Sequence, residues 1–201
     1  MSETGSVKFT HEQDSADPIS FRDLAALNRC RRQLLQLSLL GVDAAGIGFG
    51  NVSVRDPIGG FVITGSNTGA LPELGAEQLS RVTAFNLDRN WLRCDGATIA
   101  SSESLTHAAV YEADESVSAV IHCHSRPIWK ALRNIAPTTS ADIEYGTPAM
   151  AREVARLFTS SKVKESRLFI MAGHEDGVVS FGQNLEGAFA VLLRAMHNPS
   201  S

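Results

Sequence analysis

Two histidines separated by one residue carry the clearest chemistry in this 201-residue sequence. They lie in the apolar segment Val120-Ile121-His122-Cys123-His124-Ser125, which we expect to form a strand. Because alternate side chains of a strand point to the same face, His122 and His124 project together and Cys123 projects to the other face. Neutral imidazoles are good ligands for zinc and other late first-row divalent metals. The pair predicts part of a metal site, although two polar residues on a half-exposed strand would give the same pattern.

A third histidine fits the same site. A catalytic zinc ion usually takes three protein ligands and keeps one position open for substrate. His174 follows the apolar segment 168–171 and opens a turn, so we expect it at the end of a strand, where sheet proteins often place functional groups. We therefore predict His174 as the third ligand beside His122 and His124.

An acidic residue is expected near these histidines. Ser101-Ser102-Glu103 lies at the predicted start of a helix that leads directly into the His122 strand. A carboxylate beside a dication can be a fourth ligand before substrate binds and a general base afterwards. The alternative is that Glu103 only complements the helix dipole. His107 lies one turn further along the helix, and we expect it to be a hydrogen-bonded structural residue.

The elements that position these residues alternate between helices and strands. Helical periodicity and capping residues predict helices that begin at Ser20, at Ser101 or Ser102, at Thr147 and at Asn184. Runs rich in β-branched residues predict strands at 52–55, 61–64, 82–87, 91–94, 117–122, 168–171 and 177–181. Because strands occur both in hairpins and between helices, we expect an α/β protein with one mixed sheet covered by helices.

The composition is that of one ordinary globular domain, with 43% hydrophobic and 20% charged residues. Residues 1–17 are polar and lack periodicity, so we expect a loose N-terminal arm followed by a single domain at 18–201. The formal net charge of -4 without clustered cations argues against a nucleic-acid or polybasic membrane surface. No signal-peptide pattern is present, and three cysteines without paired spacing fit free thiols. We expect a cytoplasmic protein.

Several motifs in a fixed order resemble the class II aldolase/adducin family, whose enzymatic members include aldolases and epimerases of sugar phosphates. The motifs are Gly50-Asn51-Val52-Ser53, Thr68-Gly69, Ser101-Ser102-Glu103, His122-Cys123-His124 and Gly173-His174. The resemblance covers residues 21–196. It implies a three-layer α/β/α fold, a zinc ion bound by the three histidines, and Glu103 as the catalytic acid/base. It also implies a homotetramer with active sites between subunits.

The resemblance further implies a pocket for a phosphate or another part of the substrate. Glycine-rich turns and helix N-termini present free backbone N–H groups to anions, and hydroxyl groups add donors. The residues that match this pocket are Asn51, Thr68, Gly69, Ser101 and Ser102. Ordinary turn or capping chemistry is the alternative for each. Thr64-Gly65 is a second Thr-Gly pair in the same loop and competes with Thr68-Gly69.

The segment between His124 and His174 departs from the sugar-phosphate aldolases of this family. It is shorter, and the missing part is the loop that there carries a tyrosine proton donor into the neighbouring subunit's site. Asp142, Glu144 and Tyr145 are the ionisable residues of the shortened segment. Glu175 and Asp176 follow the third histidine, where they would repel a phosphorylated substrate or orient the metal ligands.

Two classes of function follow. The first is a zinc-dependent lyase of aldolase type, in which the metal stabilises an enediolate of a small hydroxy-carbonyl or sugar-phosphate substrate while Glu103 moves a proton. Epimerisation, dehydration and decarboxylation can use the same metal-bound enolate. The second is a non-catalytic, adducin-like assembly module. Such a module has no need of three histidines and Glu103, so we favour the enzyme.

Overall fold

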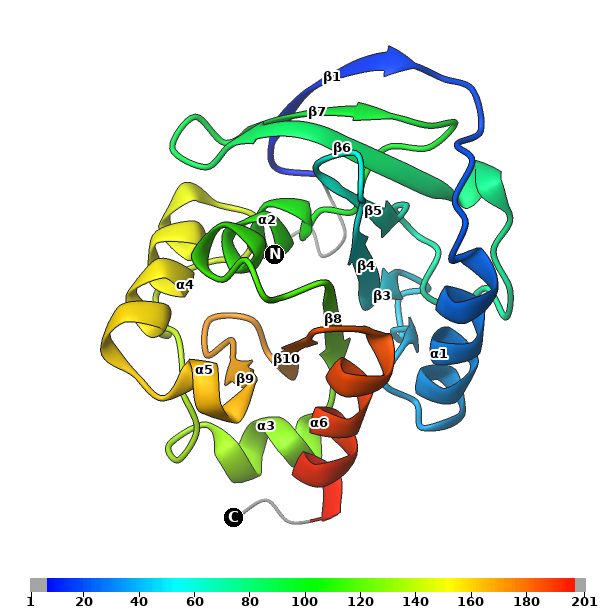
Figure 1. Cartoon of the computed structure of the whole chain (residues 1–201). Helices are drawn as coiled ribbons and strands as arrows, with labels where there is room; N and C mark the ends of the chain where they lie inside the picture. Colours follow the sequence, from blue (N-terminus) through cyan, green and yellow to red (C-terminus); the bar gives the residue numbers. More distant parts are fainter. Residues whose placement is uncertain (1–6, 198–201) are drawn as a thin grey trace.

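A mixed β-sheet lies between two layers of helices in the computed structural model, which describes residues 7–197 (Figure 1). The strands are β1 (Thr10–Ser15), β2 (Gly41–Val42), β3 (Gly48–Phe49), β4 (Asn51–Arg55), β5 (Phe61–Thr64), β6 (Leu79–Asn86), β7 (Trp91–Asp95), β8 (Ala119–His124), β9 (Leu168–Ile170) and β10 (Gly177–Gly182). The helices are α1 (Leu24–Gln36), α2 (Ser104–Ala113), α3 (Arg126–Leu132), α4 (Pro148–Ser160), α5 (Val163–Ser166) and α6 (Leu185–His197), with a 3₁₀ turn at Ala76–Gln78.

Eight strands form the main sheet in the order β1-β7-β6-β5-β4-β8-β10-β9, and β2 pairs with β3 in a separate hairpin. The β1–β7 pair is parallel, and the other neighbours in the main sheet are antiparallel. The predicted fold class, a three-layer α/β/α arrangement around a mixed sheet, is confirmed. β8 lies in the interior of the sheet between β4 and β10, so its side chains reach both helical layers.

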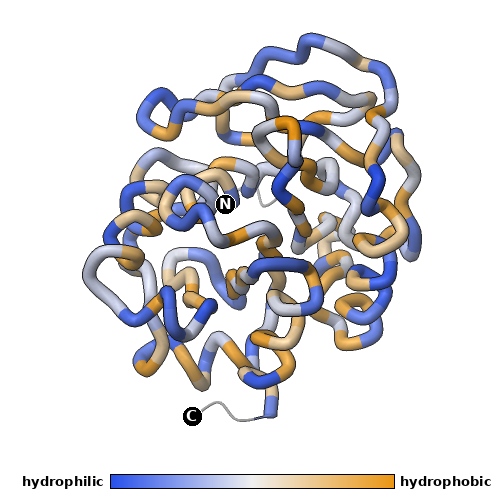
Figure 2. Tube along the Cα trace, viewed as in Figure 1, coloured by the Kyte–Doolittle hydropathy of each residue, from blue (hydrophilic) through white to orange (hydrophobic). Residues whose placement is uncertain are grey.

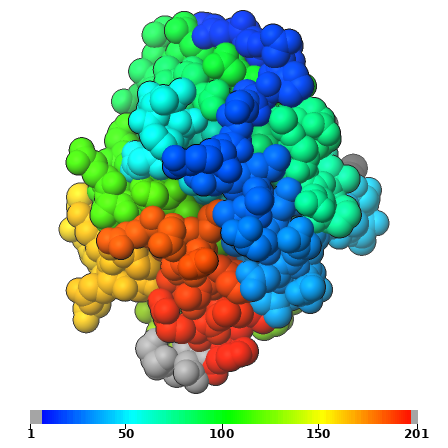
Figure 3. Space-filling view, turned by 45° about the vertical axis from the view of Figure 1, so that its right-hand side comes forward, coloured from blue at the N-terminus to red at the C-terminus, as the bar shows by residue number. Residues whose placement is uncertain are grey.

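The two faces of the sheet bury separate hydrophobic clusters. One face packs against α2 and α4 and includes Val120 of β8. The other packs against α1, α3 and α6 and includes Ile121 and Cys123. Figure 3 shows α1 and α6 side by side on this second layer. The alternation along β8 therefore directs His122 and His124 toward the α2 layer, as expected from the sequence.

Local sequence explains some helix ends and not others. α4 begins as predicted, because the Thr147 hydroxyl accepts a hydrogen bond from the Met150 N–H and Pro148 occupies the first position. The prediction of Ser20 as the cap of the first helix is wrong, since α1 begins at Leu24. α3 was not predicted, because it is one seven-residue element with too few turns to show a period.

The expectation of a loose arm over residues 1–17 is wrong for residues 10–15, which form β1 along the edge of the sheet. Both faces of this strand are largely exposed, so its sequence lacks the alternation that identifies a half-buried strand. Figure 2 shows it mainly as hydrophilic. Phe9, which is 5% exposed, anchors the strand in the α2–α4 cluster. Residues 1–6 lie outside the described part of the chain.

The helices are short relative to a bilayer. Across residues 7–197, none is both long enough and apolar enough to cross a membrane. The three cysteines, Cys30, Cys94 and Cys123, are buried and unpaired.

Candidate active site and metal centre

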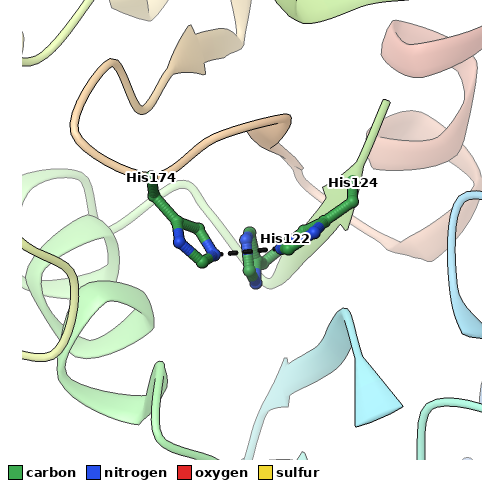
Figure 4. Close-up of side chains that lie close together, drawn as sticks. All are labelled: His122, His124 and His174. Carbon is green, nitrogen blue, oxygen red and sulfur yellow. Dashed lines mark hydrogen bonds between the residues drawn. The ribbon is translucent and has the colours of Figure 1, made fainter. Parts of the chain in front are cut away.

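Three imidazole rings meet at one end of β8. His122 and His124 come from this strand, and His174 comes from the turn between β9 and β10 (Figure 4). One ligand nitrogen from each ring lies within 4.8 Å of the others. Nε2 of His124 and Nε2 of His174 are 2.9 Å apart. The structure thus brings together the three histidines that the sequence analysis selected.

Backbone pairing holds His174 in reach of β8. β10 pairs with β8 such that Gly177 is opposite His124, which brings the preceding turn over the strand end. Gly173 lets this turn pack closely against the backbone of Ile143, because a Cβ atom at position 173 would lie 2.1 Å from the carbonyl oxygen of Ile143. A larger residue at position 173 would push the turn and His174 away from the site.

The three imidazoles are in the neutral form that binds metals. Burial, followed by the neighbouring His124 and His174, holds the pKa of His122 well below its ordinary value. Burial is also the main cause that lowers the pKa of His174 to about 3 and lowers that of His124. Nε2 of His122 is buried and has no hydrogen-bond partner among the described residues. A set of three neutral nitrogens fits a divalent transition metal, with these residues as its ligands.

Glu103 lies immediately before α2 and lines the same pocket as the histidines. Its side chain is 2% exposed. Oε2 accepts a hydrogen bond from the Thr106 hydroxyl at 2.7 Å, and Oε1 has no partner among the described residues. Burial raises the pKa of Glu103 to about 7, against smaller opposing effects of Thr106 and Lys8. A carboxyl group that titrates near neutrality is suited to both donate and accept a proton.

Most of the predicted anion-binding residues line this pocket. Those that do are Asn51, Gly69, Ser101 and Ser102, together with Gly65, Ser66 and Asn67 from the same loop. Thr68 does not line it, since its hydroxyl donates to the carbonyl oxygen of Gly65 at 2.8 Å. The Thr64 hydroxyl likewise accepts from the backbone N–H of Val52. Both threonine side chains satisfy their own surroundings, so the loop offers its backbone to the pocket.

Asn51 connects the metal centre to this loop region. It lies opposite His122 in the β4–β8 pair, and its Nδ2 is 2.9 Å from Ser101 Oγ and 3.4 Å from His122 Nδ1. The latter contact occupies one nitrogen of the His122 ring and leaves Nε2 for a metal. Gly69 allows the loop to close on β3, because a Cβ atom there would lie 2.5 Å from the Phe49 carbonyl oxygen.

Tyr145, one of the ionisable residues of the shortened segment, lies beside the histidines, together with Lys8 and Phe49, which the sequence analysis did not single out. The Tyr145 ring, 6% exposed, lies 4.4 Å from the His174 ring. The Lys8 ammonium is 4.0 Å from the centre of the Tyr145 ring and 3.2 Å from Glu144. Phe49 stacks on His124 at 4.9 Å. Phe49 adjoins the Gly50-Asn51 motif, which could have indicated it, whereas no local signal marks Lys8.

The remaining acidic residues lie outside the pocket that contains Glu103. Asp142 is exposed. Glu175 forms an ion pair with Arg126, and Asp176 lies 3.4 Å from the same guanidinium. Arg126 therefore partly neutralises the charge that follows His174. His107, on the buried side of α2, is hydrogen-bonded to Ser53 at 2.7 Å, as expected of a structural histidine.

The fold and this constellation define a protein of the class II aldolase type. The family model described as "Class II Aldolase and Adducin N-terminal domain" matches residues 43–197. The chain belongs to this family, which confirms the resemblance seen in the motifs. Lys8 and β1 precede the matched segment.

Solved structures with the same fold include several aldolases. L-fuculose-1-phosphate aldolase from Thermus thermophilus is similar with 22% identity and a TM-score of 0.62, covering 87% of this chain and 89% of that one. A second L-fuculose 1-phosphate aldolase gives 20% identity and a TM-score of 0.68 over 89% and 84%. YgbL from Klebsiella pneumoniae, a putative aldolase/epimerase/decarboxylase, gives 20% and 0.67 over 90% and 91%. No curated protein sequence matches the chain significantly.

Proposed function

We propose that this protein is a zinc-dependent lyase of aldolase type that cleaves a small hydroxy-carbonyl or sugar-phosphate substrate. The observation that carries the proposal is that Glu103 and all three histidines line one pocket. Both the Glu103 Oε1 and the His122 Nε2 atoms are buried there without a hydrogen-bond partner among the described residues. Polar atoms left in this state are costly to the fold. Other buried atoms, such as Nε2 of His107, are also unpaired, but three imidazoles and a carboxylate meet only in this pocket of the described chain, which favours a role in binding and catalysis.

The chemistry of the proposed metal is that of a Lewis acid. His122, His124 and His174 would hold the zinc ion, which when bound polarises a carbonyl oxygen of the substrate. Neutral imidazoles leave the ion its full positive charge, and the shared pocket gives substrate access to it.

Glu103 and Tyr145 are the residues we assign to proton transfer. Cleavage removes the proton of the substrate hydroxyl, breaks the carbon–carbon bond next to it, and returns one proton to the carbon beside the carbonyl. Glu103 acts at that carbon, because its pKa of about 7 allows it to carry the proton in either direction. Tyr145 lies against His174 in the same pocket and is placed to serve the hydroxyl. No net proton is consumed.

The other end of the substrate is bound by the loop region. Asn51, Gly69, Ser101 and Ser102 line the pocket next to the histidines and supply amide, hydroxyl and backbone donors. This arrangement suits a phosphate or another polar group held at a fixed position from the carbonyl.

We also propose that the protein is a cytoplasmic homotetramer. Exposed apolar side chains, among them Ile58 at 81% and Ile135 at 68%, are consistent with subunit contacts. The three buried free cysteines suit a reducing compartment. Light scattering on an active, metal-loaded sample tests the assembly: a tetramer is expected, and a monomer would contradict it.

The decisive test of the reaction is Glu103→Gln. A screen of short hydroxy-aldehydes, hydroxy-ketones and their phosphates first identifies a substrate by the appearance of two carbonyl products. Because the amide keeps the size of the side chain but cannot exchange the proton, turnover should fall by roughly 10²–10⁴. Metal content should stay unchanged, since three histidines remain.

The matched control is Glu112→Gln, which removes an exposed carboxylate from the same helix and should leave turnover at the wild-type level. Loss of metal from Glu103→Gln would make Glu103 a structural ligand. Normal turnover would move the acid/base role to Tyr145 or its loop. A single isomerised product in the screen would replace the lyase with an epimerase.

A further inference from the structure

A buried positive charge without an acidic partner lies behind the loop that lines the pocket. Arg31 is on the inner side of α1 and is 1% exposed. Among residues 7–197, no carboxylate oxygen lies within 4.0 Å of its nitrogens. Burial lowers its pKa to about 10, so the guanidinium stays charged at neutral pH. An unpaired buried charge is costly, and proteins retain one only where something compensates it.

The neutral partners of Arg31 are carbonyl groups of the pocket loop. Nη2 donates to the Thr68 carbonyl oxygen at 2.7 Å and Nη1 to that of Leu71 at 3.0 Å. Nε has no partner in the described part of the chain. Two carbonyl dipoles satisfy hydrogen bonds but do not neutralise a full charge. The positive charge of Arg31 therefore remains available to a ligand on the other side of the loop.

One peptide unit separates this guanidinium from the pocket. The Thr68 carbonyl that accepts from Arg31 belongs to the same amide as the Gly69 N–H, and Gly69 lines the pocket. A hydrogen bond to the oxygen of an amide makes its N–H a stronger donor. Thus the contact strengthens a donor at the pocket wall.

The loop also has the form of an anion-binding backbone. Asn67 adopts a left-handed conformation with φ of 60°. The N–H groups of Asn67, Thr68 and Gly69 donate to no acceptor within residues 7–197. Successive N–H groups beside a left-handed residue form a concave site for anions. Yet the residues that line this pocket include no lysine or arginine, so an anion bound there meets no direct cationic side chain.

We propose that Arg31 is a positioning residue for an anionic group of the substrate: it holds loop 65–69 in its anion-binding form, and the bound anion is its counter-charge. The inference rests on the proposed function for the identity of the pocket. It narrows the substrate to hydroxy-carbonyl compounds that carry a phosphate or a carboxylate.

The test measures anion binding without any reaction. Metal-free protein at pH 8, where the histidines are neutral, is titrated by calorimetry with inorganic phosphate and separately with acetate. Arg31→Met should weaken binding of the preferred anion about 10- to 50-fold through the lost charge. Arg31→Lys keeps the charge but cannot reproduce both hydrogen bonds of the guanidinium, so it should lose less affinity than Arg31→Met and stay within about 5-fold of wild type. Phosphate preferred over acetate indicates a phosphate ester, and the reverse a carboxylate.

Two controls separate this effect from damage to the fold. Arg29→Met removes an exposed positive charge from the same helix and should leave anion affinity unchanged. Cobalt(II) affinity of the three histidines, read from its visible absorption, should be equal in all variants. If Arg31→Met fails to fold by circular dichroism, Arg31→Gln replaces it and should show the same loss of anion affinity.

Wild-type anion affinity in Arg31→Met would overturn the proposal. A loss of anion affinity in Arg31→Lys equal to that in Arg31→Met would overturn it as well. Wild-type protein that binds cobalt(II) but neither anion would also overturn it and leave the lyase intact. Protein that binds phosphate but no cobalt(II) would instead contradict the proposed function and leave the role of Arg31 standing.

Discussion

A single buried histidine, His107, and the cluster of His122, His124 and His174 lie on the same side of the sheet and differ in their surroundings. His107 on α2 is 0% exposed and bonds to Ser53, whose hydroxyl also contacts Tyr111 at 2.8 Å. His122 is 2% exposed and has two further imidazoles within reach. Burial lowers the pKa of both. Burial and a low pKa therefore do not distinguish a ligand from a structural residue, whereas the neighbours of the ring do.

The difference teaches what a metal site requires. The His107 ring is fully buried: its Nδ1 bonds to the Ser53 hydroxyl, and its Nε2 has no partner among the described residues and no second ligand group near it. The three-histidine group opens into a pocket with a carboxylate at its edge. Convergence of several ligand atoms on one accessible point is the property that only the second group has.

The largest effect expected from this comparison is on metal affinity. His174→Ala should weaken cobalt(II) binding by at least about 10³-fold, because two ligands hold the ion far less well than three. His107→Asn should leave it within about 3-fold. Titration followed by visible absorption measures both. Equal losses in the two variants would show that His174 acts on the metal only through the fold.

The second effect is on stability, where substitution of His107 should have a larger effect than substitution of His174. His107→Ala leaves a cavity and removes one of the two hydrogen-bond partners of the buried Ser53 hydroxyl, so it should cost about 2–4 kcal/mol in the free energy of unfolding. His174→Ala, at the pocket wall, should cost less than half of that in metal-free protein. Urea unfolding of both metal-free variants provides the comparison. If His107→Ala is more stable than His174→Ala, the structural role of His107 is contradicted.

The pH dependence of stability gives a third test. The pKa of His107 falls to about 3 in the folded protein from 6.5 in the unfolded chain. Below pH 6.5 the unfolded state binds a proton that the folded state refuses. The stabilisation is therefore complete above pH 6.5 and is lost as the pH falls toward 3. Between pH 7.5 and 5, the metal-free wild-type protein should therefore lose about 1–2 kcal/mol more free energy of unfolding than metal-free His107→Gln. An unchanged pH profile would show that His107 does not contribute.

How well the sequence predicts a feature of this structure depends on how far apart in the chain the contacting residues lie. The Thr147 cap and the alternation along β8 are local, and both were predicted from a few neighbouring residues. Thr68 was placed in the pocket because the motif does not show that its hydroxyl bonds to Gly65. The contact of Lys8 with Glu144 joins residues 136 positions apart, and no local pattern encodes it.

The smallest effect concerns that distant contact. Lys8 packs on Tyr145 and pairs with Glu144. A cation–π contact and a surface ion pair together contribute about 1 kcal/mol. Lys8→Met should therefore loosen Tyr145 and lower kcat/KM by about 3- to 10-fold. Lys8→Arg should restore most of the activity. Lys130→Met, an exposed lysine on α3, is the control. Full activity in Lys8→Met would show that Lys8 does not support Tyr145 in the reaction.

The central claim is that the three histidines hold a catalytic metal, and elemental analysis of the purified protein tests it most directly. We predict about one divalent metal ion per chain, with zinc the main element, in wild-type protein and in His107→Asn. His124→Ala should contain almost none after the same purification. Full metal occupancy in His124→Ala would contradict the claim.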